Sequence, residues 1–91
     1  MRYTVFYRNR LAMPFAPAPA TVSMTDYKEV GTVEAEDLED LFRIMNVVDG
    51  SEFEMPQKLK CRSMCSGDVA VDQAGQAHYC ASIGWQPTKF A

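Results

Sequence analysis

The three cysteines and the single histidine of this 91-residue chain are the side chains that could bind a metal or take part in nucleophilic catalysis. They form two short motifs, Cys61-x-x-x-Cys65 and His78-x-Cys80. Thiolate and imidazole groups are the ligands of tetrahedral zinc sites, so these side chains could bind zinc if a turn brings the motifs together. The spacing lacks the C-x-x-C pair of zinc knuckles, however, and free cysteine on an apolar face behaves as a small hydrophobic residue. We therefore predict no metal and no cofactor. The alternative is a metal or small-molecule site, whose residues would be Cys61, Cys65, Asp68, His78 and Cys80.

Nucleophilic catalysis by a cysteine and a histidine would use the same residues. It requires a base near the thiol, a group that orients the base, and donors for the developing oxyanion. The sequence shows no such set, and Asp68, which follows Gly67, is explained as a turn residue that accepts backbone N–H groups. We predict that the protein is not an enzyme.

The charge pattern suggests a different kind of chemistry. The whole chain has a net charge of −3, but the segment from Glu34 to Glu54 holds eight acids and one base, so that segment is −7 and the rest is +4. Acids at the start of a helix stabilise it, because free N–H groups and the positive end of the dipole lie there. The same carboxylates could also imitate a phosphate track and occupy a basic site on a host protein. The predicted partner-binding face consists of Glu36, Asp37, Glu39, Asp40 and Arg43.

A basic row could instead bind nucleic acid. Lys58, Lys60 and Arg62 alternate with apolar residues, as on the outer face of a half-buried strand. Phosphate contacts usually require a basic excess, which the net charge of −3 does not provide. Nucleic-acid binding through this row is therefore an alternative rather than the main prediction.

The elements that must position these residues follow from periodicity and turn residues. Leu38, Leu41, Phe42, Met45 and Val48 recur at helical spacing and predict an amphipathic helix of about three turns. The out-of-phase pair Val30 and Val33 predicts a bulge at Gly31. The predicted strands are Tyr3–Asn9, Tyr27–Ala35, Lys58–Ser63, Val69–Val71 and Gln76–Gly84, with a proline-rich loop at residues 11–21, a hairpin turn at residues 72–75 and frayed residues at the end.

These elements predict one α+β domain spanning residues 1–91. Its core would be a small, mainly antiparallel β-sheet of four to five strands, with the one amphipathic helix packed on one face. One helix covers only part of such a sheet. The face left open, carrying some of Tyr3, Phe6, Tyr7 and Tyr79, is therefore a candidate for partner binding or a homodimer.

The compartment is inferred from cysteine usage and hydropathy. An odd number of cysteines cannot form a complete disulfide framework, which favours a reducing environment. No apolar run approaches the roughly 20 residues of a membrane helix, and the polar start does not lead into a signal-peptide core. We expect a cytoplasmic protein.

Three stretches of the sequence resemble a known family. They are the run Leu38–Asn46, the run Arg62-Ser63-Met64-Cys65-Ser66-Gly67-Asp68-Val69, and His78-Tyr79-Cys80 through Gly84-Trp85. Together they resemble the YodL-like domain of phage, plasmid and other mobile-element proteins, whose signature is approximately an R-S-M-S-x-G-D-V turn, a hairpin and a closing G-F or G-W. The resemblance covers the C-terminal two thirds of the chain, and Cys65 stands where serine is more usual.

The resemblance implies a setting, and no reaction or ligand. Small proteins of mobile elements often act by binding host machinery. We therefore expect a non-enzymatic, phage- or mobile-element-encoded binding protein that inhibits or modulates a host or defence protein, in the manner of an anti-defence protein. It would bind through the acidic helix face or the open sheet face.

Overall fold

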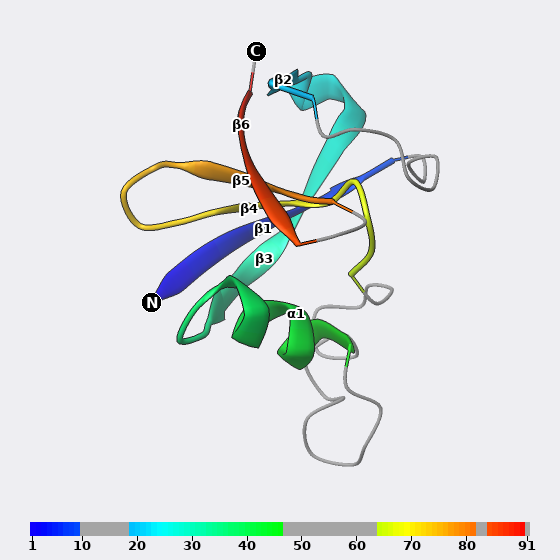
Figure 1. Cartoon of the computed structure of the whole chain (residues 1–91). Coiled ribbons are helices and arrows are strands. Elements are labelled where there is room, and N and C mark those ends of the chain that lie inside the picture. The colour runs from blue at the N-terminus through cyan, green and yellow to red at the C-terminus, as the bar shows by residue number, and fades with distance from the viewer. Residues whose placement is uncertain (10–18, 47–63, 82–83, 91) are drawn as a thin grey trace.

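A curved six-stranded sheet carries one helix against one of its faces (Figure 1). The computed structural model describes residues 1–9, 19–46, 64–81 and 84–90. The sheet order is β2-β6-β5-β4-β1-β3, and every neighbouring pair is antiparallel except β2 and β6. The elements are β1 (Arg2–Arg8), β2 (Thr21–Val22), the short 3-10 helix η1 (Met24–Asp26), β3 (Tyr27–Glu34), α1 (Leu38–Asn46), β4 (Val69–Val71), β5 (Ala77–Cys80) and β6 (Trp85–Phe90).

The predicted α+β class is confirmed, and the predicted strand number is wrong. Two strands were not expected: β2, at the end of the proline-rich segment, and β6, where frayed residues were predicted. Several predictions lie outside the described residues: most of the 11–21 loop, Val48, the strand Lys58–Ser63 with its basic row, and Cys61.

β1 is the central strand of the helix-covered half of the sheet. It pairs with β3 on one side and with β4 on the other, and its residues alternate between the two faces. Tyr3, Val5 and Tyr7 are buried on the helix side, whereas Phe6 packs on the opposite side. This alternation is the one expected from the sequence.

The predicted bulge in β3 is present. Val5 pairs with Gly31, but the next residue, Phe6, pairs with Glu29, so Val30 is the extra residue on the bulged strand. Val30 and Val33 consequently both pack into the helix-side core. The bulge thus converts an out-of-phase apolar pair into a continuous apolar face.

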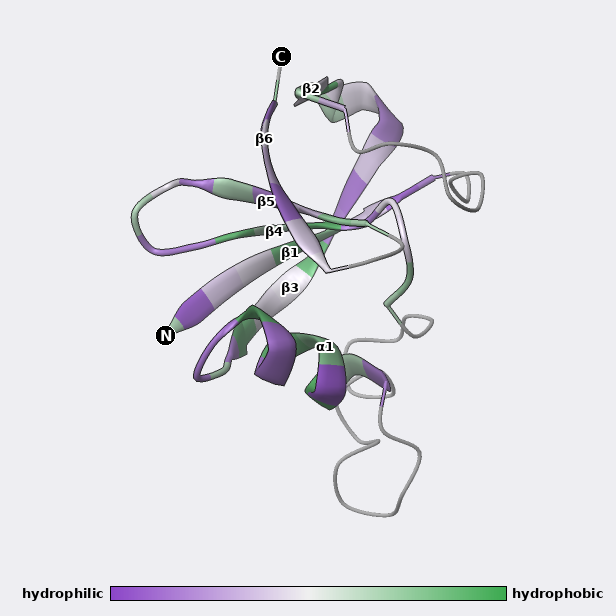
Figure 2. Ribbon diagram, viewed as in Figure 1, coloured by the Kyte–Doolittle hydropathy of each residue, from purple (hydrophilic) through white to green (hydrophobic). Residues whose placement is uncertain are grey.

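α1 is nine residues long and begins at a capped turn. The Asp37 carboxylate accepts the Asp40 N–H at 2.8 Å, and the Asp40 carboxylate accepts the Glu36 N–H at 3.0 Å. The helix carries hydrophobic and hydrophilic residues around its circumference (Figure 2) and buries Leu41 and Met45 fully. Phe42 was expected to face the core, but its side chain is 40% exposed.

The second face of the sheet is closed by curvature. Phe90 of β6 packs edge-on against Phe6 of β1, with ring centroids 5.1 Å apart, and against Tyr27 of β3 at 5.6 Å. Two strands separate β6 from β1 in the sheet, so these contacts require a strong curl. The segment from Ser23 to Asp26 also links the two edge strands, β2 and β3, directly.

The expected open aromatic face is therefore wrong. Tyr3 and Tyr7 are buried on the helix side, and Tyr79 is buried in the second cluster beside Val69. A homodimer stays a prediction, without the exposed face on which it rested. Among the described residues, no helix is long and apolar enough to cross a membrane.

A buried carboxylate joins the separate parts of the sheet. Asp68 is fully buried, and its two oxygens accept the N–H of Arg8 at 3.0 Å and of Cys65 at 2.9 Å. Its backbone carbonyl accepts the Cys80 N–H at 2.8 Å. The end of β1, the turn before β4 and the end of β5 thus meet at one residue.

We predict that Asp68→Ala lowers the free energy of unfolding by about 2–5 kcal/mol, because two backbone donors lose a charged acceptor. Asp68→Asn keeps one carbonyl oxygen and should lose less. Urea unfolding followed by circular dichroism measures both variants. Equal stabilities of Asp68→Ala and the wild type would show that these hydrogen bonds do not hold the sheet together.

Candidate functional site

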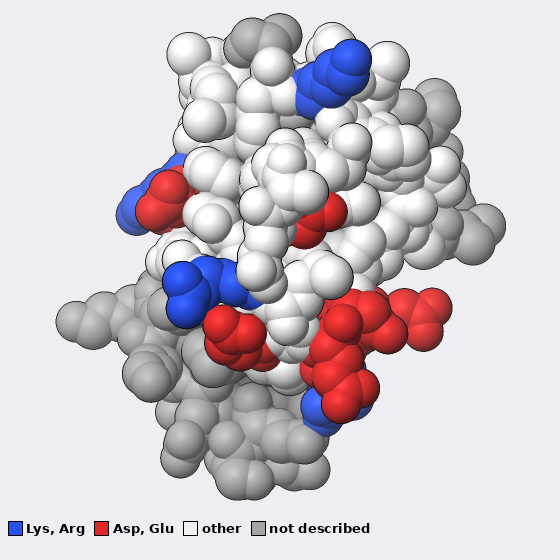
Figure 3. Space-filling model, turned by 90° about the vertical axis from the view of Figure 1, so that its left-hand side faces the viewer, with Lys and Arg blue, Asp and Glu red and all other residues white. Residues whose placement is uncertain are grey.

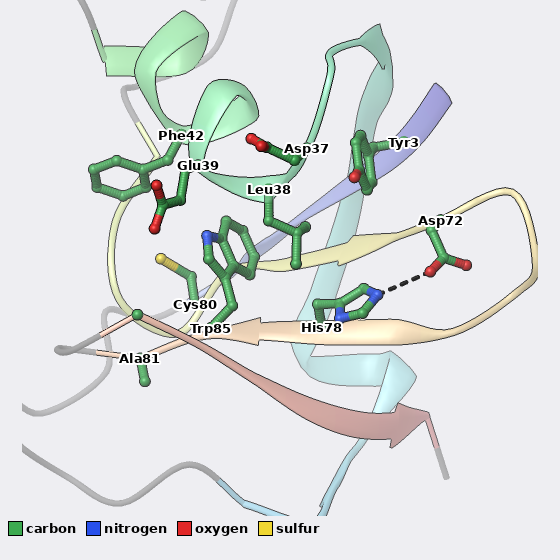
Figure 4. A pocket seen from close by; sticks show the side chains of 11 residues that line it. Tyr3, Asp37, Leu38, Glu39, Phe42, Asp72, His78, Cys80, Ala81 and Trp85 are labelled. Atoms are coloured by element: carbon green, nitrogen blue, oxygen red, sulfur yellow. Dashed lines mark hydrogen bonds and ion pairs between the residues drawn. The ribbon is translucent and has the colours of Figure 1, made fainter. Parts of the chain in front are cut away.

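A pocket lies where the start of α1 meets the β5–β6 end of the sheet (Figure 4). Its volume is about 760 Å³, within the roughly 300–1,000 Å³ typical of ligand sites. It is partly open to solvent. The described residues that line it are Tyr3, Asp37, Leu38, Glu39, Phe42, Asp72, His78, Cys80, Ala81, Gly84 and Trp85.

Strand register brings the floor of this pocket together. His78 and Cys80 are two residues apart on β5, so both side chains point to the helix-side face. Trp85, the first residue of β6, pairs with Cys80 across the β5–β6 ladder. Gly84 has a φ of 74°, and its carbonyl accepts the Ala81 N–H at 2.9 Å. The indole of Trp85, the next residue, faces the pocket (Figure 4).

Aromatic and apolar groups form the walls. α1 contributes Leu38 and Phe42, β1 contributes Tyr3, and β6 contributes Trp85. Trp85 and Leu38 are only partly buried, and both pack against the helix-side core. The pocket thus adjoins the helix-side core.

Three carboxylates lie around the aromatic walls. Asp37 and Glu39 come from the start of α1, and Asp72 comes from the turn after β4. Asp37 is engaged as the helix cap. In Figure 4 the carboxylate of Glu39 is seen between the Phe42 ring and the Trp85 indole. The ionisable groups of the pocket are therefore mainly acidic.

His78 and Asp72 form a hydrogen-bonded pair at one side of the pocket. Nε2 of His78 lies 2.9 Å from Oδ2 of Asp72, and both side chains are only about one fifth exposed, at 22% and 20%. The other Asp72 oxygen accepts the N–H groups of Ala74 and Gln76, each at 3.0 Å. The hydrogen bond from His78, followed by that from Gln76, lowers the pKa of Asp72 below its usual value. The turn thus fixes the carboxylate, and the carboxylate orients the imidazole.

The predicted cysteine and histidine cluster is only partly assembled. His78 and Cys80 both line the pocket, whereas Cys65 and Asp68 are not among its lining residues. Cys65 and Asp68 instead belong to the hydrogen-bonded junction behind it. Within the described residues, no three metal-binding side chains converge on one point. Burial raises the pKa of Cys80 to about 12, so the neutral thiol, a poor ligand and nucleophile, is the form present at neutral pH.

The predicted acidic face lies beside the pocket. Figure 3 shows a dense group of acidic side chains in this region, at the lower right of the view. Glu36, Asp37 and Glu39 are exposed, while Asp40 is half-buried and bonded to Arg43 at 2.7 Å. The Glu36 N–H and then the Arg43 guanidinium hold the pKa of Asp40 below its usual value. Of the five predicted residues, only Asp37 and Glu39 line the pocket.

Several pocket residues were not predicted from the sequence. Asp72 was assigned only to a hairpin turn, and Phe42 to the apolar face of the helix. The alternation of His78 and Cys80 along one strand was a usable signal, because it places both on one face. The contribution of α1 to the same site depends on how the helix lies on the sheet, and no local pattern contains that information.

A scan against protein-family models and searches of the curated proteins and of the solved structures each returned no match for this chain. The resemblance to the YodL-like domain therefore stays a prediction.

We predict that Cys80 of the native protein resists alkylation. Relative to an ordinary thiol with a pKa of 9.0, its pKa of about 12 lowers the thiolate fraction about 1,000-fold at neutral pH. Iodoacetamide labelling followed by peptide mass spectrometry compares the native and urea-unfolded chains. Cys65, which is partly exposed, is the internal control and should react first. Native labelling of Cys80 as fast as in urea would contradict this assignment.

Asp72 should make the stability of the fold depend on pH. Because the folded-state pKa of Asp72 is lowered, its ionised form stabilises the folded state above its ordinary pKa of 3.8, and this contribution disappears as the pH falls through the lowered value. Asp72→Asn should therefore be less stable than the wild type at neutral pH and equally stable in strong acid. Thermal melts of both proteins across this range provide the measurement. A difference that persists unchanged in acid would exclude a charge effect.

Proposed function

We propose that this protein is a non-enzymatic binding protein that attaches to a basic partner protein through the pocket and the adjoining acidic surface at the start of α1. The acidic surface consists of Glu36, Asp37, Glu39 and Asp40. The observation that carries the proposal is the combination, in one open cavity, of aromatic walls with surrounding carboxylates. Protein interfaces commonly combine aromatic anchors at the centre with polar groups at the rim.

The electrostatics favour a positively charged partner. Arg43, the basic residue of α1, is bonded to Asp40. It therefore neutralises the charge of Asp40, a carboxylate that already takes part in the helix cap. Glu36 and Glu39 retain exposed carboxylates. Complementary charge raises the association rate and rejects acidic partners.

The resemblance to the YodL-like domain supports a setting for this binding. The three resembling stretches include the pocket residues Phe42, His78 and Trp85. In that setting the partner is a host or defence protein, which this protein inhibits or modulates by covering a basic site.

Small-molecule binding is the second candidate, and one observation favours it. The pocket volume of about 760 Å³ suits a drug-sized ligand, with His78 and Asp72 as fixed polar groups. Nucleic-acid binding has less support at this site, because carboxylates repel phosphates. Its predicted residues Lys58, Lys60 and Arg62 lie outside the described residues.

The test is affinity capture from a bacterial lysate with wild-type protein, Glu39→Gln and Glu29→Gln, quantified by mass spectrometry. Glu39 lines the pocket, whereas Glu29 is exposed on β3, so the two variants remove the same charge at different places. Both leave the caps Asp37 and Asp40 intact. We expect a discrete partner whose Kd rises about 5- to 30-fold with Glu39→Gln and does not change with Glu29→Gln. Its binding should also weaken as the salt concentration rises. If the amount of captured partner changes with neither substitution nor with salt, the proposal is contradicted.

A further inference from the structure

We infer that the pocket receives an arginine side chain of the partner protein, with its guanidinium between Phe42 and Trp85 and against the carboxylate of Glu39. The inference rests on the proposed function and names the group recognised at that site. The occupant has to match three features of the pocket: its charge, its aromatic walls and its size.

The charge calls for a cation. Asp72 already accepts hydrogen bonds from His78 and two backbone amides, and Asp37 accepts the Asp40 N–H. Among the described residues, no donor is bonded to the carboxylate of Glu39. Both oxygens of this carboxylate can therefore accept an incoming N–H group, whereas Asp37 has one oxygen bonded within the helix cap.

The walls favour a planar cation. The side chain of Phe42 is 40% exposed on a helix whose buried residues are Leu41 and Met45, so its ring contributes little to the core. It lines the same cavity as the half-buried indole of Trp85. Guanidinium groups stack on aromatic faces and present several N–H donors in one plane, whereas an ammonium group is a compact, strongly hydrated charge. Two aromatic rings and a carboxylate that line one cavity (Figure 4) therefore fit arginine better than lysine.

The size calls for more than one side chain. A cavity of about 760 Å³ also has space for the residues that flank the arginine. Leu38, Ala81 and Tyr3 provide apolar or amphipathic contacts for them. An exposed segment of a partner protein meets this requirement.

The experiment uses Trp85, the one tryptophan of the chain, as the reporter. Intrinsic fluorescence of the full chain is followed during titration with the blocked tripeptides Ala-Arg-Ala, Ala-Lys-Ala and Ala-citrulline-Ala. Citrulline has nearly the shape of arginine without its charge. We expect the arginine peptide to bind at least about fivefold more tightly than either of the others. Glu39→Gln should remove most of the preference over citrulline, and Phe42→Leu should weaken arginine binding severalfold. Glu29→Gln should change nothing.

Three results would overturn the inference. They are equal affinity for the arginine and citrulline peptides, tighter binding of the lysine peptide, and no fluorescence change with any peptide. The last result counts at peptide concentrations up to about 20 mM, far above the Kd of a specific site. If the peptides fail while affinity capture still shows a partner that depends on Glu39, the arginine assignment is wrong and the proposed function stands. If the capture fails and the arginine peptide binds with the stated pattern, the site recognises a free small guanidinium compound instead of a protein.

Discussion

The buried carboxylate of Asp68 is the constraint on which the rest of the structure depends. A carboxylate without solvent must be satisfied by hydrogen bonds, and here the backbone N–H of Arg8, 60 residues away, and that of Cys65, in the same turn, provide them. The adjoining Gly67 carbonyl accepts the hydroxyl of Tyr27 at 2.6 Å, which ties the start of β3 to the same point. One junction therefore sets the positions of β1, β3, β4 and β5. Because β5 carries His78 and Cys80, the junction also sets the floor of the pocket.

The pocket lies at the start of α1, beside the core that the helix covers. α1 is nine residues long and packs its buried residues against the core formed by β1 and β3. The helix-side face of β5 and β6 is left beside the first turn of the helix. That turn is acidic for a structural reason, since Asp37 accepts the N–H of Asp40 in the first turn and Asp40 accepts the N–H of Glu36, just before the helix. Glu39 has no such role among the described residues, and it extends the acidic character of the cap into the cavity.

The fold was predictable where the determinants are local. The alternation in β1, the bulge beside Gly31, the helix start and the hairpin after Val71 all follow from short patterns. β2 has two residues, and β6 contains Pro87, so neither carries a strand signal, and both depend on pairing with distant segments. The curl of the sheet was missed for the same reason. It buries Tyr79, which was among the residues expected on the open face of the sheet.

The site was predictable only in part, because its residues come from separate elements. His78 and Cys80 were identified from residue type, and Glu39 from charge, but nothing in the sequence placed them around one cavity. Asp68 was correctly assigned to a turn, where its carboxylate accepts a backbone N–H. Its link to Arg8, 60 residues away, required the folded sheet.

Binding at this pocket can be tested with an amide and indole chemical-shift map of isotope-labelled protein titrated with an arginine-containing peptide. We expect the largest shifts at Glu39, Phe42 and the indole N–H of Trp85, with none along the exposed edge of β3. Shifts centred on β3, or spread evenly over the molecule, would contradict the claim that this pocket is the binding site.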